Sequence, residues 1–280
     1  MKEPAAKSYT IGRGSGCDIA LGDNSVSRPH ATLRLGQDGT IELSDHPSRL
    51  GTFVYRGGAW QRIDSAIVRP EEPVMFGEFR TTVKRVLGLV RPAGDGKTTA
   101  DNAGGETRRT VAVLIADVVG YSRGMSQDPS GTLAALKAAR RDLVDPVILL
   151  HDGRIFGEAG DSVCAEFAGA AAAVAAACGL QTKLESAAFG PQAKRLTFRI
   201  GIHAGEVIVR EDNLFGSPVN IAARLQTLAT PGRICISEDV KAQLGAEPGV
   251  PLVDLGAKPL KNIPEPVRVF EIAPGNAAPN

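Results

Sequence analysis

The sequence predicts two domains of different fold class, an N-terminal all-β sandwich and a C-terminal α+β domain. The chain has 280 residues, which is long for a single hydrophobic core. From 9 to 90, short β-type runs alternate with turn residues, a spacing that is typical of an antiparallel sandwich. After Arg109, strand-like and helix-like segments alternate irregularly, and this pattern indicates an α+β domain.

The first domain is expected over 1–91 and is followed by a flexible linker over 92–108. The linker is rich in Gly, Ala, Thr and Asp and has no apolar periodicity. The strand-like runs of the first domain are YTIGR (9–13), ATLRL (31–35), TIELSD (40–45), GTFVYR (51–56), AIVRP (66–70), EPVMF (72–76) and RTTVKRVLGLV (80–90).

The second domain is expected over 109–273, with a tail over 274–280. It begins with VAVLIAD, a continuous apolar run that predicts a strand buried on both faces and ending in Asp117. A helix is predicted from about 129 to 151 and an alanine-rich helix over 168–186. Between them, RIF–GEAGD–SVCAEF predicts a hairpin that carries Asp161 at its tip.

The last part of the second domain starts with RLTFRIGIHAGEVIVR, which is interpreted as a strand pair turning near Gly205 and Glu206. A helix is then predicted to start with Ser217 as its N-cap and Pro218 in its first position. The runs RICIS, VDLG and VRVFEI predict a closing strand–helix–strand–strand segment.

Composition excludes several classes of protein. The net charge of +1 gives no case for nucleic acid or an anionic membrane as a partner. We expect no membrane span, because no run of 18 or more uncharged apolar residues occurs. The N-terminus lacks the apolar core of a secretory signal, and the four scattered cysteines form no CxxC pair. These features predict a cytoplasmic protein.

Two groups of polar residues suggest chemistry in the second domain. If the hairpin lies beside the first strand, Asp117 and Asp161 converge, and paired carboxylates suit Mg²⁺ bound to a polyphosphate. The alternative is that each aspartate caps a helix or turn. Asn220 and Arg224 are four residues apart on one helix face and suit a ribose and a phosphate. Their alternative is a solvated helix face.

Five segments follow one another over 109–273: IADVVGYSR, GRIF–x3–GDSVCAEF, FRIGIHAGEVI, GSPVNIAARL and PLKNIPEPVRVFEI. In these segments the second domain resembles the class III adenylate/guanylate cyclase catalytic domain. The resemblance implies a ferredoxin-like α+β core and a head-to-tail homodimer with active sites between the subunits. It also implies conversion of a nucleoside triphosphate, ATP by default with GTP as the alternative, into its cyclic monophosphate.

The resemblance implies a role for each matching residue. Asp117, Asp161 and the backbone carbonyl of Val118 would bind two divalent cations, Mg²⁺ or Mn²⁺. The triphosphate would be held by backbone amides of Gly120, Tyr121 and Ser122. The partner subunit would supply Asn220 and Arg224 for the ribose and the transition state, and Lys261 would contact the phosphates.

The sequence departs from the family at the two positions that select the base. Members that use ATP have a lysine four residues before the second metal aspartate and an aspartate seven before the asparagine. Here these positions hold Gly157 and Asn213, neither of which carries a charge. Asn213 can still hydrogen-bond a base, because an amide both donates and accepts. The choice between adenine and guanine stays open.

The first domain contains the segment IGRGSGCDIALGDNSVSRPHATLRL. Over about 8–90 the domain thereby resembles the forkhead-associated (FHA) domain, a β-sandwich that recognises phosphothreonine. It implies that Arg13, Ser27 and Arg28 bind the phosphate of a phosphothreonine-containing protein, and that His30 supports the loops from inside. Leu50 stands where the family has an asparagine that holds the backbone of the bound peptide, and leucine has no amide group for this contact.

Together these features predict an adenylate cyclase regulated through phosphopeptide binding. One alternative is a signalling adaptor whose cyclase-like domain only senses nucleotide or dimerises. Another is a cyclase with relaxed or guanine preference, and the sandwich itself could serve only for packing or dimerisation.

Overall fold

The computed structural model describes residues 7–14, 16–90, 107–210, 213–245 and 249–273. The chain divides into two compact units, Met1–Asn102 and Ala103–Asn280. The predicted linker up to residue 106 and the tail over 274–280 lie outside the described residues. Residues 107 and 108, which were expected in the linker, belong to the first strand of the second unit.

The first unit is a sandwich of two sheets, which confirms the predicted all-β fold. The first sheet has the order β2-β1-β3-β4-β7 and the second β6-β5-β8-β9. Their strands are β1 (Lys7–Gly12), β2 (Ile19–Ala20), β3 (Ala31–Leu35), β4 (Ile41–Asp45), β5 (Thr52–Arg56), β6 (Ala59–Ile63), β7 (Ser65–Val68), β8 (Pro73–Phe76) and β9 (Phe79–Thr82). Alternating apolar residues from both sheets form one core, which includes Ile11, Leu33, Leu43, Val54 and Phe76.

The interpretation of RTTVKRVLGLV as one strand is wrong. The strand β9 ends at Thr82, and helix α1 (Val83–Gly88) follows. The Thr82 hydroxyl accepts a hydrogen bond from the Arg85 N–H at 3.4 Å, so it acts as an N-cap, and Val83 and Val86 bury one face of the helix. The strand β6 was not predicted, because most of its residues are exposed and show no apolar alternation.

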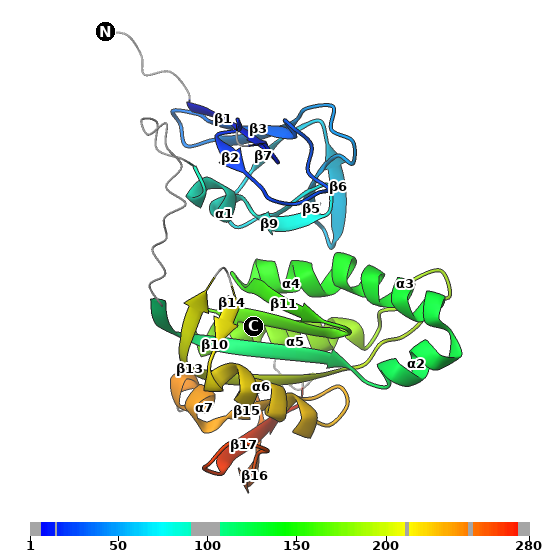
Figure 1. Ribbon diagram of the computed structural model, residues 1–280, viewed down its shortest axis with the longest axis vertical. Helices are drawn as coiled ribbons and strands as arrows, with labels where there is room; N and C mark the ends of the chain where they lie inside the picture. The colour runs from blue at the N-terminus through cyan, green and yellow to red at the C-terminus, as the bar shows by residue number, and fades with distance from the viewer. Residues whose placement is uncertain (1–6, 15, 91–106, 211–212, 246–248, 274–280) are drawn as a thin grey trace. The chain divides into compact units, whose positions relative to one another are not determined.

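The second unit is built on a mixed sheet with the order β11-β12-β10-β13-β15-β17-β16, and β14 pairs with β13. The long strands β10 and β13 lie antiparallel in the middle (Figure 1). The strands are β10 (Thr107–Val118), β11 (Arg154–Ala159), β12 (Ser162–Phe167), β13 (Phe198–Arg210), β14 (Asn213–Phe215), β15 (Ile234–Ser237), β16 (Leu252–Lys258) and β17 (Val267–Ile272). This arrangement confirms the predicted α+β fold.

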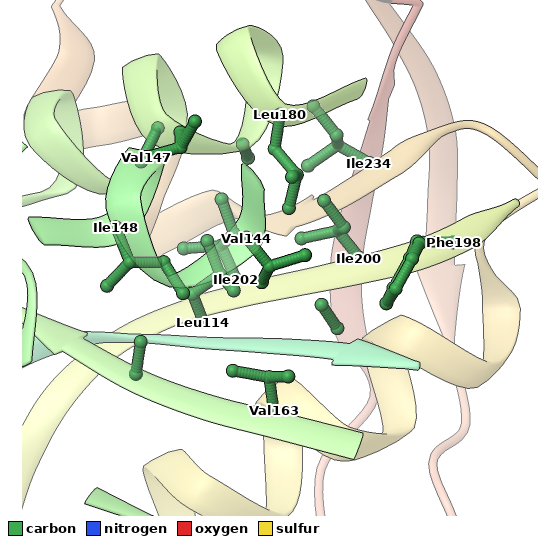
Figure 2. Close-up of a cluster of buried hydrophobic side chains, with 14 of the residues drawn as sticks. Leu114, Val144, Val147, Ile148, Val163, Leu180, Phe198, Ile200, Ile202 and Ile234 are labelled. Carbon is green, nitrogen blue, oxygen red and sulfur yellow. The ribbon is translucent and has the colours of Figure 1, made fainter. Parts of the chain in front are cut away.

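Helices cover both faces of this sheet, because β10 is apolar on both sides. They are α2 (Tyr121–Gln127), α3 (Pro129–Ala139), a π-helical turn η1 (Arg140–Val144), α4 (Asp145–Leu150), α5 (Ala170–Leu184), α6 (Ser217–Leu228) and α7 (Glu238–Leu244). Leu114 and Ile202 pack against Val144 and Leu180 on one face (Figure 2). On the other face, Val113 packs with residues of α6.

Two details of the second unit differ from the predictions. The run 195–210 does not form a strand pair: β13 continues through Gly205, because residues up to Val209 pair with the beginning of β10. The glycines serve close packing instead, since a Cβ at Gly201 would lie 2.2 Å from the Ala222 carbonyl oxygen of α6. The N-cap of α6 is Gly216, and Ser217 is already helical.

Within the described residues, no helix is long and apolar enough to cross a membrane.

Candidate functional sites

The two predicted metal-binding aspartates meet at one end of the sheet. Pairing of β10 with β12 runs to Ala116 opposite Val163, so the end of β10 lies beside the tip of the β11–β12 hairpin. The Val118 N–H donates to Asp161 Oδ2 at 3.2 Å. The Ser162 hydroxyl donates to Asp117 Oδ1 at 2.6 Å. The hairpin therefore does lie beside the first strand, and the two carboxylates converge.

The electrostatics of this pair favour a cation. Burial of Asp161 and the negative charge of Asp117 raise the pKa of the Asp161 carboxyl. A divalent cation relieves this repulsion, and carboxylate oxygens are ligands that Mg²⁺ and Mn²⁺ prefer. Among the described residues, no group of three or more His, Cys, Asp and Glu side chains could hold a metal ion.

Backbone amides follow directly after these carboxylates. The chain turns at Gly120, which has a φ of 74° and forms the N-cap of α2. Glycine adopts this left-handed conformation without strain, and it has no side chain to accept the first-turn N–H groups of the helix. Tyr121 and Ser122 begin this turn. Three predicted triphosphate-binding residues are thereby placed next to the paired aspartates.

The predicted transition-state pair lies on α6, which covers the same sheet face as Val113. Asn220 is exposed, and Arg224 is partly buried. Among the described residues, the Nε of Arg224 is one of few buried side-chain nitrogens without a hydrogen-bond partner. The i, i+4 spacing places the amide and the guanidinium on one helix face. The Nε of this guanidinium remains available to a hydrogen-bond acceptor.

The two positions expected to select the base lie on the contacting strands β11 and β14. Gly157 pairs with Cys164, which pairs with Ile115 near the end of β10. Asn213 instead pairs with Arg210, beyond the beginning of β10. The sheet is coiled, so that β14 also contacts β11, and Leu214 belongs to the same apolar cluster as Phe156 and Cys164. Figure 1 shows β14 beside the beginning of β10 and α2 after its end.

Lys261 lies at another end of the sheet than the paired aspartates. It is exposed and lies between the end of β16 and the beginning of β17. The strand β17 is antiparallel to β15, and β15 is parallel to β13, so this connection lies at the end of the sheet opposite Asp117. One chain therefore presents Asp117 and Asp161 at one end of the sheet, and the connection that carries Lys261 at the other.

Sequence reasoning missed one basic residue of this site, Arg199. Its Cα lies opposite that of Asp117 in the β10–β13 ladder, which places both side chains on the same sheet face. The Nε of Arg199 is buried and has no hydrogen-bond partner among the described residues. A basic residue at the start of the second central strand was the available sequence indication, but it becomes informative only once the register is known.

In the first unit, the structure brings Arg13 and Ser27 together. The Arg13 N–H donates to the Ser27 carbonyl oxygen at 3.0 Å, and the guanidinium Nη1 donates to Asn24 Oδ1 at 2.7 Å. The Ser27 hydroxyl accepts a hydrogen bond from the backbone N–H of Arg49 at 3.2 Å. Arg28 is exposed beside them. Asn24 and Arg49 were not predicted at this site.

His30 supports these loops from inside, as predicted. It is fully buried, and its Nδ1 accepts a hydrogen bond from the Ser27 N–H at 2.8 Å. Its Nε2 lies 3.1 Å from the Gly51 carbonyl oxygen, to which it donates when Nδ1 accepts. Burial lowers the pKa of this imidazole, which favours the neutral form that both hydrogen bonds require.

Comparison with known proteins defines the class of both units. The family model "Adenylate and Guanylate cyclase catalytic domain" matches residues 105–270, and the FHA domain model matches residues 9–77. The chain belongs to the adenylate and guanylate cyclase catalytic domain family and carries an FHA domain before its catalytic domain.

Individual relatives match the second unit. A Rhizobium meliloti protein named "Putative adenylate cyclase 3" is 36% identical over 172 residues, which are 61% of this chain and 29% of the relative. A Mycobacterium tuberculosis protein named "pH-sensitive adenylate cyclase MT1302" is 30% identical over 60% of this chain and 41% of its own length. The chain thus spans less than half of these two curated relatives.

A solved structure gives the same class of fold. The crystal structure of an adenylate/guanylate cyclase/hydrolase from Silicibacter pomeroyi has 35% sequence identity and a TM-score of 0.55. The match covers 61% of this chain and 99% of that chain.

Proposed function

We propose that this protein is an adenylate cyclase, which converts ATP into cyclic AMP and pyrophosphate with two divalent cations, and that its FHA domain regulates it by binding phosphothreonine. The observation that carries the proposal is the convergence of Asp117 and Asp161 at the end of β10, within hydrogen-bond reach of each other's neighbours. Two facing carboxylates next to backbone amides suit a metal-bound triphosphate.

Asp117, Asp161 and the carbonyl of Val118 would hold Mg²⁺ or Mn²⁺. When bound, the cations lower the pKa of the ribose 3′-hydroxyl and neutralise charge on the phosphates. The chain's own residues would position the substrate: backbone amides of Gly120, Tyr121 and Ser122, at the start of α2, would bind the phosphates. Arg199, opposite Asp117, adds a positive charge at the same sheet end.

The active site would require a homodimer. The connection that carries Lys261 lies at the end of the sheet opposite Asp117, which supports a site built from two chains. A head-to-tail partner would supply its own Lys261 and Asn213, together with Asn220 and Arg224 of its α6. In that arrangement, the Arg224 guanidinium would stabilise charge on the reacting phosphate.

Gly157 would contribute little to discrimination between adenine and guanine. This position has no side chain, and a Cβ added there would lie 3.6 Å from the Cβ of Cys164, an ordinary contact. The backbone therefore does not require glycine for space, and its presence leaves the base edge without a charged partner. Asn213 would be the remaining polar group for the base. ATP is proposed by similarity to the named adenylate cyclases.

A nucleotide assay tests the proposal. Purified protein, incubated with each of the four ribonucleoside triphosphates and with Mg²⁺ or Mn²⁺, should form cyclic AMP from ATP. We expect GTP to be discriminated by less than about a hundredfold, because no charged side chain stands at position 157. Chromatographic detection of the cyclic products measures both the formation of cyclic AMP and the preference for ATP over GTP. Absence of any cyclic product from a dimeric preparation would contradict the proposal.

The FHA domain would bind phosphothreonine through Arg13, Ser27 and Arg28. We expect Arg13→Ala to weaken binding of a phosphothreonine peptide at least about tenfold, because a charge-assisted hydrogen bond to the phosphate is lost. Fluorescence anisotropy with a peptide library would measure this. Arg34→Ala is the matched control, since Arg34 is an exposed arginine of the same sheet that pairs with Glu42. Equal affinity for phosphorylated and unphosphorylated peptides would contradict this role.

The second candidate is an adaptor that binds nucleotide without turnover. The uncharged Gly157 and Asn213 favour it, because the base would be held weakly. ATP binding without product, combined with phosphopeptide affinity that Arg13→Ala abolishes, would support the adaptor over the enzyme.

A further inference from the structure

The two aspartates of the proposed cation site are held by a reciprocal pair of hydrogen bonds. The residue that follows Asp117 is Val118, and its N–H donates to Asp161 Oδ2 at 3.2 Å. The residue that follows Asp161 is Ser162, and its hydroxyl donates to Asp117 Oδ1 at 2.6 Å. Each carboxylate is therefore bound by the neighbour of the other one.

This arrangement leaves one oxygen of each carboxylate without these donors. Asp117 Oδ1 and Asp161 Oδ2 are engaged, so Asp117 Oδ2 and Asp161 Oδ1 are the oxygens that remain for cations. Two carboxylates at close range repel each other and would otherwise turn apart. A donor on each of them fixes its rotation before any cation arrives, and this lowers the reorganisation that binding requires.

Only one of the two hydrogen-bond donors can be removed by a substitution. The Val118 N–H belongs to the backbone and is present whatever the side chain. The Ser162 hydroxyl is a side-chain group on the first residue of β12, where pairing with Ala159 and the fully buried Val163 hold the backbone in place. An alanine there removes the donor and leaves the strand unchanged, so the contribution of this hydroxyl can be measured separately.

We infer that Ser162 is a positioning residue of the cation site: its hydroxyl orients the Asp117 carboxylate so that one oxygen faces the cations. The inference rests on the proposed function, because it requires Asp117 and Asp161 to bind divalent cations. The role belongs to the hydroxyl and not to the size of the side chain. Threonine should therefore replace serine, and alanine should not.

Mn²⁺ binding to the full-length protein, followed by the electron paramagnetic resonance signal of free Mn²⁺, tests the inference. Ser162→Ala should bind Mn²⁺ roughly tenfold more weakly than the wild type, the range expected for loss of a hydrogen bond to a metal ligand. Ser162→Thr should stay within about threefold of the wild type. The control is Ser186→Ala, which should leave Mn²⁺ binding unchanged, because Ser186 is exposed and its hydroxyl donates to the Lys183 carbonyl oxygen at 3.5 Å.

The Mn²⁺ concentration that half-saturates cyclase activity should shift in the same order as binding. Equal Mn²⁺ binding by Ser162→Ala and the wild type would overturn the role of Ser162 while leaving the cation site standing. Equal loss in Ser162→Thr and Ser162→Ala would also overturn it, because a hydroxyl would then not be what matters. An Asp161→Ala variant that binds Mn²⁺ like the wild type would overturn the cation site itself, and the role of Ser162 with it.

Discussion

Asp161→Ala is expected to lower cyclase turnover by about a thousandfold or more, which corresponds to roughly 4 kcal/mol of transition-state stabilisation. The carboxylate lies at the tip of the β11–β12 hairpin, beside the end of β10, and is one of two acidic side chains proposed to hold the cations. Without it, a single carboxylate is left for two divalent ions. The rate of cyclic AMP formation at saturating ATP and Mn²⁺ measures the effect.

The fold should survive this substitution. The side chain is only half-buried, and its removal also removes the repulsion between two neighbouring carboxylates. Circular dichroism and thermal unfolding of the cation-free protein should therefore show no loss of stability. Asp161→Asn is the matched variant, because it keeps an oxygen that accepts from the Val118 N–H and loses only the charge. Undiminished turnover in either variant would remove the two-metal assignment.

Mixing two inactive variants is expected to restore activity. Arg224→Ala should be inactive by itself, because the guanidinium proposed to stabilise the reacting phosphate is absent. In a head-to-tail dimer of Asp161→Ala with Arg224→Ala, one site carries both changes and the other carries neither. Random mixing makes half of the dimers mixed, so about a quarter of wild-type activity should return. The cyclase rate after mixing and re-equilibration measures this directly.

The control for this experiment uses two changes from the same end of the sheet. Asp117→Ala mixed with Asp161→Ala should stay inactive, because every site in the mixed dimer lacks one metal carboxylate. Recovery in this control, or no recovery in the first mixture with dimers present, would contradict a site shared between subunits. The topology gives a reason for expecting a shared site, since the connection that carries Lys261 lies at the sheet end away from Asp117.

The sequence predicted those strands and helices whose residue pattern by itself indicates one type of element. The run VAVLIAD forms β10, buried on both faces, and RIF–GEAGD–SVCAEF forms the predicted hairpin. The alanine-rich segment and the Ser217–Pro218 start also predicted helices, and α5 and α6 lie there. In each case, burial of the apolar residues alone is enough to select the element.

Prediction failed where a residue has a use that only tertiary contacts reveal. Gly205 suggested a turn, yet it lies within β13, where a Cβ would come 2.9 Å from the ring of Pro218 in α6. The glycine is there for close packing and not for a reversal of the chain. The run at 80–90 has strand-like composition, but the Thr82 cap and the burial of Val83 and Val86 make its second half helical.

For the site, the sequence by itself determined the chemical groups: two aspartates, an asparagine and arginine spaced for one helix face, and a glycine-containing turn after the first strand. The tertiary structure decided which of them meet. Strand register, a long-range property, sets Asp161 beside Asp117 and adds Ser162 and Arg199 to the site. No local pattern encodes register, because it follows from the packing of whole strands and helices.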